Sequence, residues 1–121
     1  MTKTEIEESV LIIRQVMDME VDVSDPVGVL DKLNGLSNVL GLSGNLIAHA
    51  KRNYNIKAKS MLGELFAMKT TDRKLYLDTK ATDEQFLVDE TTALNKDLHY
   101  NVESCRSMLS YIKQEMLRIS Q

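Results

Sequence analysis

Apolar residues recur at every third or fourth position near the start of the chain, which is the spacing of one face of an α-helix. The recurring residues are Ile6, Val10, Ile13 and Met17. Thr4 and Glu7 have the spacing of a capping box, in which a Thr hydroxyl and a Glu carboxylate each accept a hydrogen bond from a free amide of the first turn. The pattern predicts a first helix from Thr4 to about Met19.

This period is lost between residues 20 and 25 and returns after the only proline, Pro26. Ser24 or Asp25 followed by proline has the form of a helix N-cap with proline at the first helical position. No further proline occurs up to Met68, and most apolar residues in this interval keep a helical register. We therefore predict a second, long helical element that begins at Pro26.

Gly41, Ser43 and Gly44 crowd together in the middle of this second element. The element is either one helix, about 60 Å long at 1.5 Å per residue, or a helix broken at these residues. Because each glycine in a helix interior costs about 1 kcal/mol relative to alanine, we predict a long element with a bend or break near Gly41. Small residues would also let another helix approach closely, and they are Gly35, Gly41, Gly44, Ala48 and Ala50.

Leu75 and Leu77 form an alternating pattern within 70–81, with charged residues on either side, which is typical of a loop or extended arm. Thr82 and Gln85 then have the spacing of a second capping box and predict the start of a third helix. Its apolar positions advance by three or four and approximate a heptad seam from Leu98 onward: Leu94, Leu98, Val102, Cys105, Leu109, Ile112, Met116 and Ile119. We expect this helix to pack antiparallel on the second, with Leu109 and Ile112 in the core.

The length of 121 residues favours one domain over residues 1–121, because single cores are typically built from about 50–200 residues. Few glycines, prolines and aromatic residues count against a β-sandwich or barrel. The sequence predicts an all-α fold in which three main helices form a helical hairpin or bundle. Long helices in so short a chain leave apolar surface uncovered, so we expect self-association; a monomeric three-helix bundle is the alternative.

Catalytic and metal-binding patterns are absent from the sequence. His49, His99 and Cys105 are the only soft metal ligands and lack zinc-site spacing, and Cys105 lies on an apolar stripe. The adjacent carboxylates at 83–84 and 89–90 point about 100° apart on a helix. One cysteine, no leader and no apolar run of about 20 residues predict a cytoplasmic protein without membrane contact. We predict no metal, no cofactor and no enzymatic activity.

The net charge of −3 is unevenly distributed along the chain. Residues 1–31 carry eight acidic and two basic residues, whereas residues 32–63 carry five basic residues and no acidic one. The densest part, which we call the basic island, is His49, Lys51, Arg52, Tyr54, Lys57 and Lys59. Such cations, with a tyrosine for stacking, could hold the phosphates of a single strand or a small anion. The alternative is that the island pairs with the acidic first helix, in the same chain or a neighbouring copy, and the small number of cations favours this alternative.

Residues 36–52 also resemble the core of a helix-turn-helix, with small and apolar residues around Gly41. In this interpretation Ser43 caps a recognition helix. Asn45, Ala48 and His49 would face bases, and Lys51 and Arg52 would contact phosphates.

The stretches ALNKDLH (93–99) and CRSMLSYIKQEM (105–116) resemble the closing helix of small all-α proteins found in bacteriophage early regions, with a looser similarity at 50–62. The resemblance implies a small phage-encoded accessory factor that acts in replication, recombination or counter-defence in the host cytoplasm. It implies no enzymatic residue.

These patterns together predict a protein that works by binding. The first hypothesis is a self-associating interaction module that docks on another protein through its apolar helix faces and its charge contrast. The alternative is a nucleic-acid-binding protein that uses the island at 49–59 or the segment 36–52. Its contact residues would be Asn45, His49, Lys51, Arg52, Tyr54, Lys57 and Lys59.

Overall fold

A computed structural model describes residues 1–120, and this range contains helices and no strand. The helices are α1 (Lys3–Met17), α2 (Pro26–Ser60), α3 (Leu62–Phe66), α4 (Thr70–Lys80) and α5 (Thr82–Ile119). The predicted all-α class is therefore confirmed. The three expected helices correspond to α1, α2 and α5, while α3 and α4 are two further helices that the apolar pattern did not separate.

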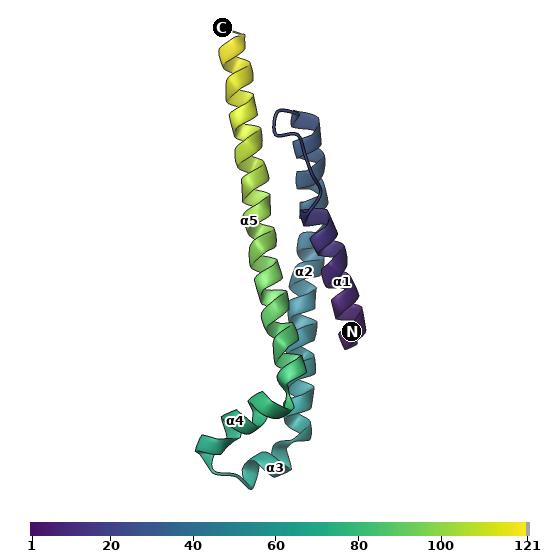
Figure 1. Ribbon diagram of the computed structural model, residues 1–121, viewed down its shortest axis with the longest axis vertical. Coiled ribbons are helices and arrows are strands. Elements are labelled where there is room, and N and C mark those ends of the chain that lie inside the picture. The colour runs from purple at the N-terminus through teal and green to yellow at the C-terminus, as the bar shows by residue number, and fades with distance from the viewer. Residues whose placement is uncertain (121) are drawn as a thin grey trace.

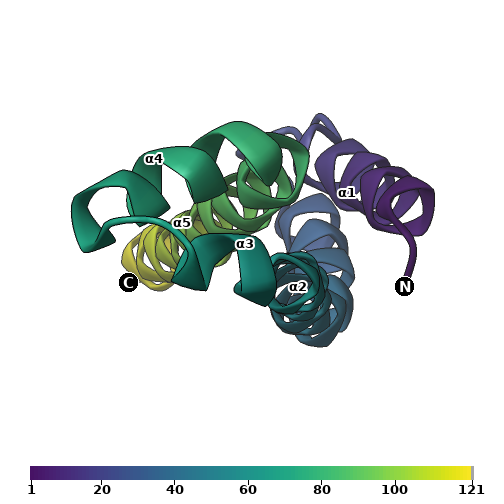
Figure 2. The same ribbon diagram turned by 90° about the horizontal axis from the view of Figure 1, so that it is seen from below.

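The two longest helices, α2 and α5, form an antiparallel hairpin (Figure 1). The shorter α1 packs against both of them and runs antiparallel to α2. At one end of the hairpin α3 and α4 form a foot that projects sideways, and at the other end α5 extends beyond the first turn of α2 (Figure 1). Seen along the hairpin, α1 lies on the side of α2 away from the foot (Figure 2).

A continuous core lies between α1, α2 and α5. The predicted stripe on α1 is confirmed, because Ile6, Val10 and Ile13 are buried. The predicted stripe on α5 is confirmed from Leu94 to Ile112, although Leu109 is only partly buried. The complete set of buried residues in this core is Ile6, Val10, Ile13, Val29, Leu36, Leu46, Ala50, Leu87, Leu94, Leu98, Val102, Cys105 and Ile112.

The cap of the first helix lies two residues before the predicted cap, Thr4. Thr2 is the N-cap, its hydroxyl accepts a hydrogen bond from the Glu5 amide (3.2 Å), and the Glu5 carboxylate accepts one from the Thr2 amide (3.1 Å). The predicted capping box at Thr4 and Glu7 is wrong, because Thr2 and Glu5 have the same spacing and make both hydrogen bonds of the box. The helix ends at Met17 rather than Met19.

Acidification should loosen this first turn. The hydrogen bonds from Thr2 lower the pKa of the Glu5 carboxyl below its usual value. A depressed carboxyl pKa favours the folded state above the unfolded pKa, and this contribution is lost as the pH falls through the folded pKa. We expect Thr2→Ala to move the Glu5 titration, followed by carboxyl-carbon NMR, part of the way toward its ordinary range, because the variant removes the Thr2 hydroxyl but keeps the backbone amide that donates to the carboxylate. An unchanged titration in Thr2→Ala would contradict the assigned cap.

The second helix begins as predicted and continues where a break was expected. The Asp25 side chain accepts a hydrogen bond from the Val27 amide (3.1 Å), and Pro26 is the first helical residue. The helix then runs without interruption to Ser60, so the break near Gly41 is wrong. Ser43 is fully buried, and its hydroxyl oxygen accepts a hydrogen bond from the side-chain Nδ2 of Asn95 (3.0 Å), which ties the middle of α2 to α5.

The segment predicted as an extended connector is the helix α4. It folds back on α3, where the Arg73 Nε donates a hydrogen bond to the Leu65 carbonyl (2.9 Å) and the Tyr76 hydroxyl donates one to the Glu64 carboxylate. A second, small core holds this foot together, and its buried residues are Met61, Leu65 and Ala81. These tertiary contacts stabilise a helix too short to be stable alone.

The third predicted helix begins at Thr82, as expected, but without the predicted capping box. The Thr82 hydroxyl donates to the carbonyl oxygens of Asp78 and Thr79 in the preceding helix. The Gln85 side chain donates to the Asp89 carboxylate (2.9 Å). Neither Thr82 nor Gln85 therefore caps the start of α5.

Candidate interaction surfaces

The basic island does not form one face of the molecule. Lys51, Arg52 and Lys59 are exposed, whereas His49 and Lys57 are partly buried. Adjacent residues on a helix point about 100° apart, so Lys51 and Arg52 diverge. None of the island cations forms an ion pair within residues 1–120, so the expected pairing with the acidic first helix of the same chain is not found there.

Tyr54, the residue expected to stack on bases, is directed toward the foot. It is partly buried and packs against the second core of Met61, Leu65 and Ala81. Because stacking requires an accessible ring face, this position makes Tyr54 a packing residue of the foot.

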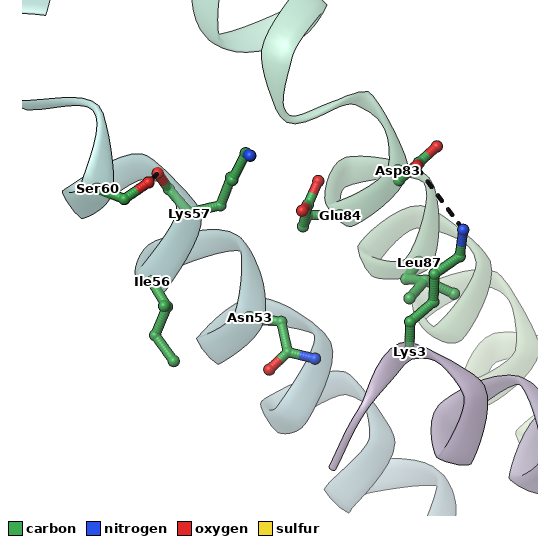
Figure 3. A pocket seen from close by; sticks show the side chains of 8 residues that line it. All are labelled: Lys3, Asn53, Ile56, Lys57, Ser60, Asp83, Glu84 and Leu87. Atoms are coloured by element: carbon green, nitrogen blue, oxygen red, sulfur yellow. Dashed lines mark hydrogen bonds and ion pairs between the residues drawn. The ribbon is translucent and has the colours of Figure 1, made fainter. Parts of the chain in front are cut away.

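Lys57 lines a pocket of about 380 Å³ between α1, α2 and α5. The pocket is lined by Lys3, Asn53, Ile56, Lys57, Ser60, Asp83, Glu84 and Leu87 (Figure 3). Lys57 points toward Glu84, and Lys3 forms an ion pair with Asp83 (3.7 Å) (Figure 3). Since two carboxylates face two ammonium groups, this pocket has no electrostatic preference for a phosphate.

The start of the chain closes one side of this region. The Asn53 side chain donates a hydrogen bond to the Met1 carbonyl (3.0 Å), and the Met1 nitrogen lies 3.5 Å from His49 Nδ1. His49 therefore contacts the start of the chain beside α1, a position that the helix-turn-helix interpretation did not foresee.

The helix-turn-helix interpretation of residues 36–52 is wrong because α2 has no turn there. Ser43, the expected cap of a recognition helix, is buried in the core. Asn45 and Ala48 are exposed on the side of a continuous helix instead.

A regular row of exposed small and polar residues runs along α2 and was not recognised from the sequence. We call it the outer stripe, and it consists of Asn38, Gly41, Asn45, Ala48, Arg52, Asn55 and Lys59. These residues are spaced alternately by three and four, so they share one side of the helix. The signal in the sequence is a repeat of small and polar residues, which apolar periodicity does not reveal.

Exposed apolar side chains on α5 and α1 lie on regular faces of these helices. On α5 the heptad seam continues past Ile112, which is 8% exposed, to Met116 and Ile119, which are 54% and 83% exposed. On α1 the face opposite the core carries Glu8, Leu11, Ile12 and Gln15, and Leu11 and Ile12 are 61% and 52% exposed.

Reactive groups do not converge in the described part of the chain. Cys105 is a buried free thiol, as expected from its place on the apolar stripe. No cluster of three or more His, Cys, Asp or Glu residues suited to a metal ion occurs within residues 1–120. In the same range, no helix combines the length and apolar character required to cross a membrane.

Comparison with known proteins found no matching family model, no matching curated protein and no matching solved structure.

Proposed function

We propose that this chain is a small, non-enzymatic accessory protein of the bacteriophage early-region kind that acts by binding and self-associates in the cytoplasm. The observation that carries the proposal is the unpartnered end of the α5 seam. Ile112 is covered by the core, while Met116 and Ile119, the next two seam positions, have no partner within residues 1–120.

A heptad seam buries its a and d positions against another helix. From Leu98 to Ile112 that partner is the rest of the same molecule. Beyond Ile112 the seam keeps its spacing, and a second copy of α5 could cover it in the same way. Burial of Met116 and Ile119 would remove apolar area from water, which favours association by about 25 cal/mol per Å² before the costs of binding are subtracted.

The double variant Met116→Lys and Ile119→Lys should reduce self-association, because ammonium groups would have to be buried at the seam. The matched control is Leu117→Lys, since Leu117 is 56% exposed but lies off the seam. Both variants should keep the helicity of the wild type by circular dichroism. We expect light scattering to show a lower average mass for the seam variant alone. Equal masses for the two variants would exclude this seam as the contact.

The resemblance to phage early-region proteins supports a protein partner in replication, recombination or counter-defence. Isolation of the tagged wild type and the seam variant from infected host cells would test this part. A partner retained by both proteins would use a surface other than the α5 seam.

Binding to nucleic acid is the second candidate function. It is favoured by the exposure of Lys51, Arg52 and Lys59 without an ion pair within residues 1–120. If these cations contact phosphates, the wild type should bind single- or double-stranded nucleic acid at low salt and lose affinity as salt rises. Lys51→Glu with Arg52→Glu should abolish this binding while helicity and assembly are retained. Absence of measurable wild-type binding at low salt would exclude the function.

A further inference from the structure

We propose that the outer face of α1 in one copy docks, antiparallel, on the outer stripe of α2 in a second copy. The inference rests on the self-association of the proposed function and adds a second contact, separate from the α5 seam. Three observations support it: two glycines without a packing role, exposed apolar residues on α1, and unpaired charges of opposite sign on the two surfaces.

Gly41 and Gly44 have no packing role within the described part of the chain. A Cβ atom at either position would meet no atom within 4 Å, whereas one at Gly35 would lie 3.4 Å from the Val16 side chain. A glycine in a helix interior is destabilising relative to alanine. Gly35 is explained by the close approach of α1. The corresponding helix of a second copy would provide a close approach at Gly44.

The exposed residues of α1 have the shape that such a surface accepts. Leu11 and Ile12 lie on the face away from the core and project from α1. The small residues Gly41, Gly44 and Ala48 leave a shallow region on the exposed side of α2. Large apolar side chains of one helix that enter a region of small residues on another bring the two helices close together.

The charges of the two surfaces are complementary. Glu8 is exposed on α1 and Arg52 and Lys59 are exposed on α2, and none of the three forms an ion pair within residues 1–120. No acidic residue occurs between 32 and 63, so the outer stripe presents only cations and neutral polar groups. Opposite charges across an interface set its orientation and disfavour wrong partners.

One antiparallel register pairs the exposed apolar residue Ile12 and the acidic Glu8 of α1 with suitable residues of the outer stripe. In antiparallel helices, moving four residues toward the start of one corresponds to moving four residues toward the end of the other. If Ile12 lies opposite Ala48, Glu8 therefore lies opposite Arg52 and Gln15 lies opposite Asn45. This register pairs an apolar residue with a small one, an acid with a base, and two amides that can hydrogen-bond.

A charge exchange tests this register. Glu8→Arg and Arg52→Glu, each alone, should raise the Kd of self-association by at least about tenfold, because each places like charges together. The double variant Glu8→Arg with Arg52→Glu should restore most of the wild-type affinity. Affinity would be measured by sedimentation equilibrium, with helicity checked by circular dichroism.

A steric variant gives a second, independent test. Gly44→Leu should weaken association without lowering the thermal midpoint of the dissociated protein, because residue 44 is exposed and a Cβ there meets no atom within 4 Å. Gly63→Leu is the matched control, since a Cβ at Gly63 also meets nothing within 4 Å but lies in the foot. The control should associate as the wild type does.

The outcomes separate this inference from the proposed function. A wild type that is monomeric at all concentrations contradicts both. A wild type that associates through the α5 seam, with charge and glycine variants that associate equally well, overturns the docking of α1 on α2 alone. Loss of nucleic-acid binding in Arg52→Glu with unchanged association would also overturn it and would assign Arg52 to phosphate contact.

Discussion

Leu98→Ala is expected to lower the free energy of unfolding by about 2–5 kcal/mol. Leu98 is fully buried in the core between α1, α2 and α5, so truncation would leave a cavity that the rigid hairpin can only partly fill. Chemical denaturation followed by circular dichroism measures the change. Leu117→Ala is the control on the same helix, and we expect a change within about 0.5 kcal/mol because Leu117 is exposed.

Leu109→Ala should fall between these two values, because Leu109 is only partly buried against the core. The sequence pattern alone placed Leu109 in the core, where Leu109→Ala would cause the full loss in free energy of unfolding that is expected for a buried leucine. A loss for Leu98→Ala no larger than that for Leu117→Ala would mean that the face of α5 is assigned wrongly.

Gly44→Pro is expected to destabilise the protein by about 3 kcal/mol or more. Proline at this position would remove the amide hydrogen that continues the helix and would clash with the carbonyl of Leu40. The variant also distinguishes the continuous α2 from the broken helix predicted earlier. If the chain turned at Gly41 and Ser43 capped a new helix, proline at 44 would be the first helical residue and would be tolerated.

Gly44→Ala is the matched control for the proline variant. A Cβ at this position meets no atom within 4 Å, so alanine should stabilise the helix by up to about 1 kcal/mol. A proline variant as stable as the wild type would show that α2 is interrupted near residue 41.

The sequence predicted those parts of the fold in which apolar periodicity is strong and continuous. Ile6, Val10 and Ile13 were assigned correctly, as were the α5 positions from Leu94 to Ile112 except Leu109, which is only partly buried. The start of α2 followed from Asp25 and Pro26, because a cap and a proline specify a boundary locally. In each case the residues that form the sequence pattern are the same residues that pack in the core or cap the helix.

Two of the wrong predictions, the break near Gly41 and the connector at 70–81, concern segments whose conformation is determined by distant contacts. The glycines near residue 41 favour a break locally, but Leu36, Ser43 and Leu46 are buried against the other helices on both sides of them. The segment 70–81 lacks an apolar stripe, yet the hydrogen bonds of Arg73 and Tyr76 to the preceding helix hold it helical. The spacing of residues along the sequence predicts neither the burial of α2 around its glycines nor the hydrogen bonds between α4 and α3.

The candidate site was predicted in composition but not in geometry. The excess of cations between residues 32 and 63 is visible in the sequence, whereas their directions depend on which side of α2 is buried. Lys57 faces a pocket that contains two carboxylates, and Tyr54 packs in the foot. Only the buried side of α2 shows that Arg52 belongs with Gly41, Asn45 and Ala48 on one exposed stripe.

The most direct test of the central proposal, self-association of the helical hairpin, is the mass of the wild-type protein in solution. Light scattering coupled to gel filtration, repeated over a wide range of protein concentration, measures this mass without a partner or a variant. We predict a stable mass of two or more chains, each of 13.7 kDa. A mass of 13.7 kDa at every concentration would contradict the proposal and leave the monomeric bundle as the working form.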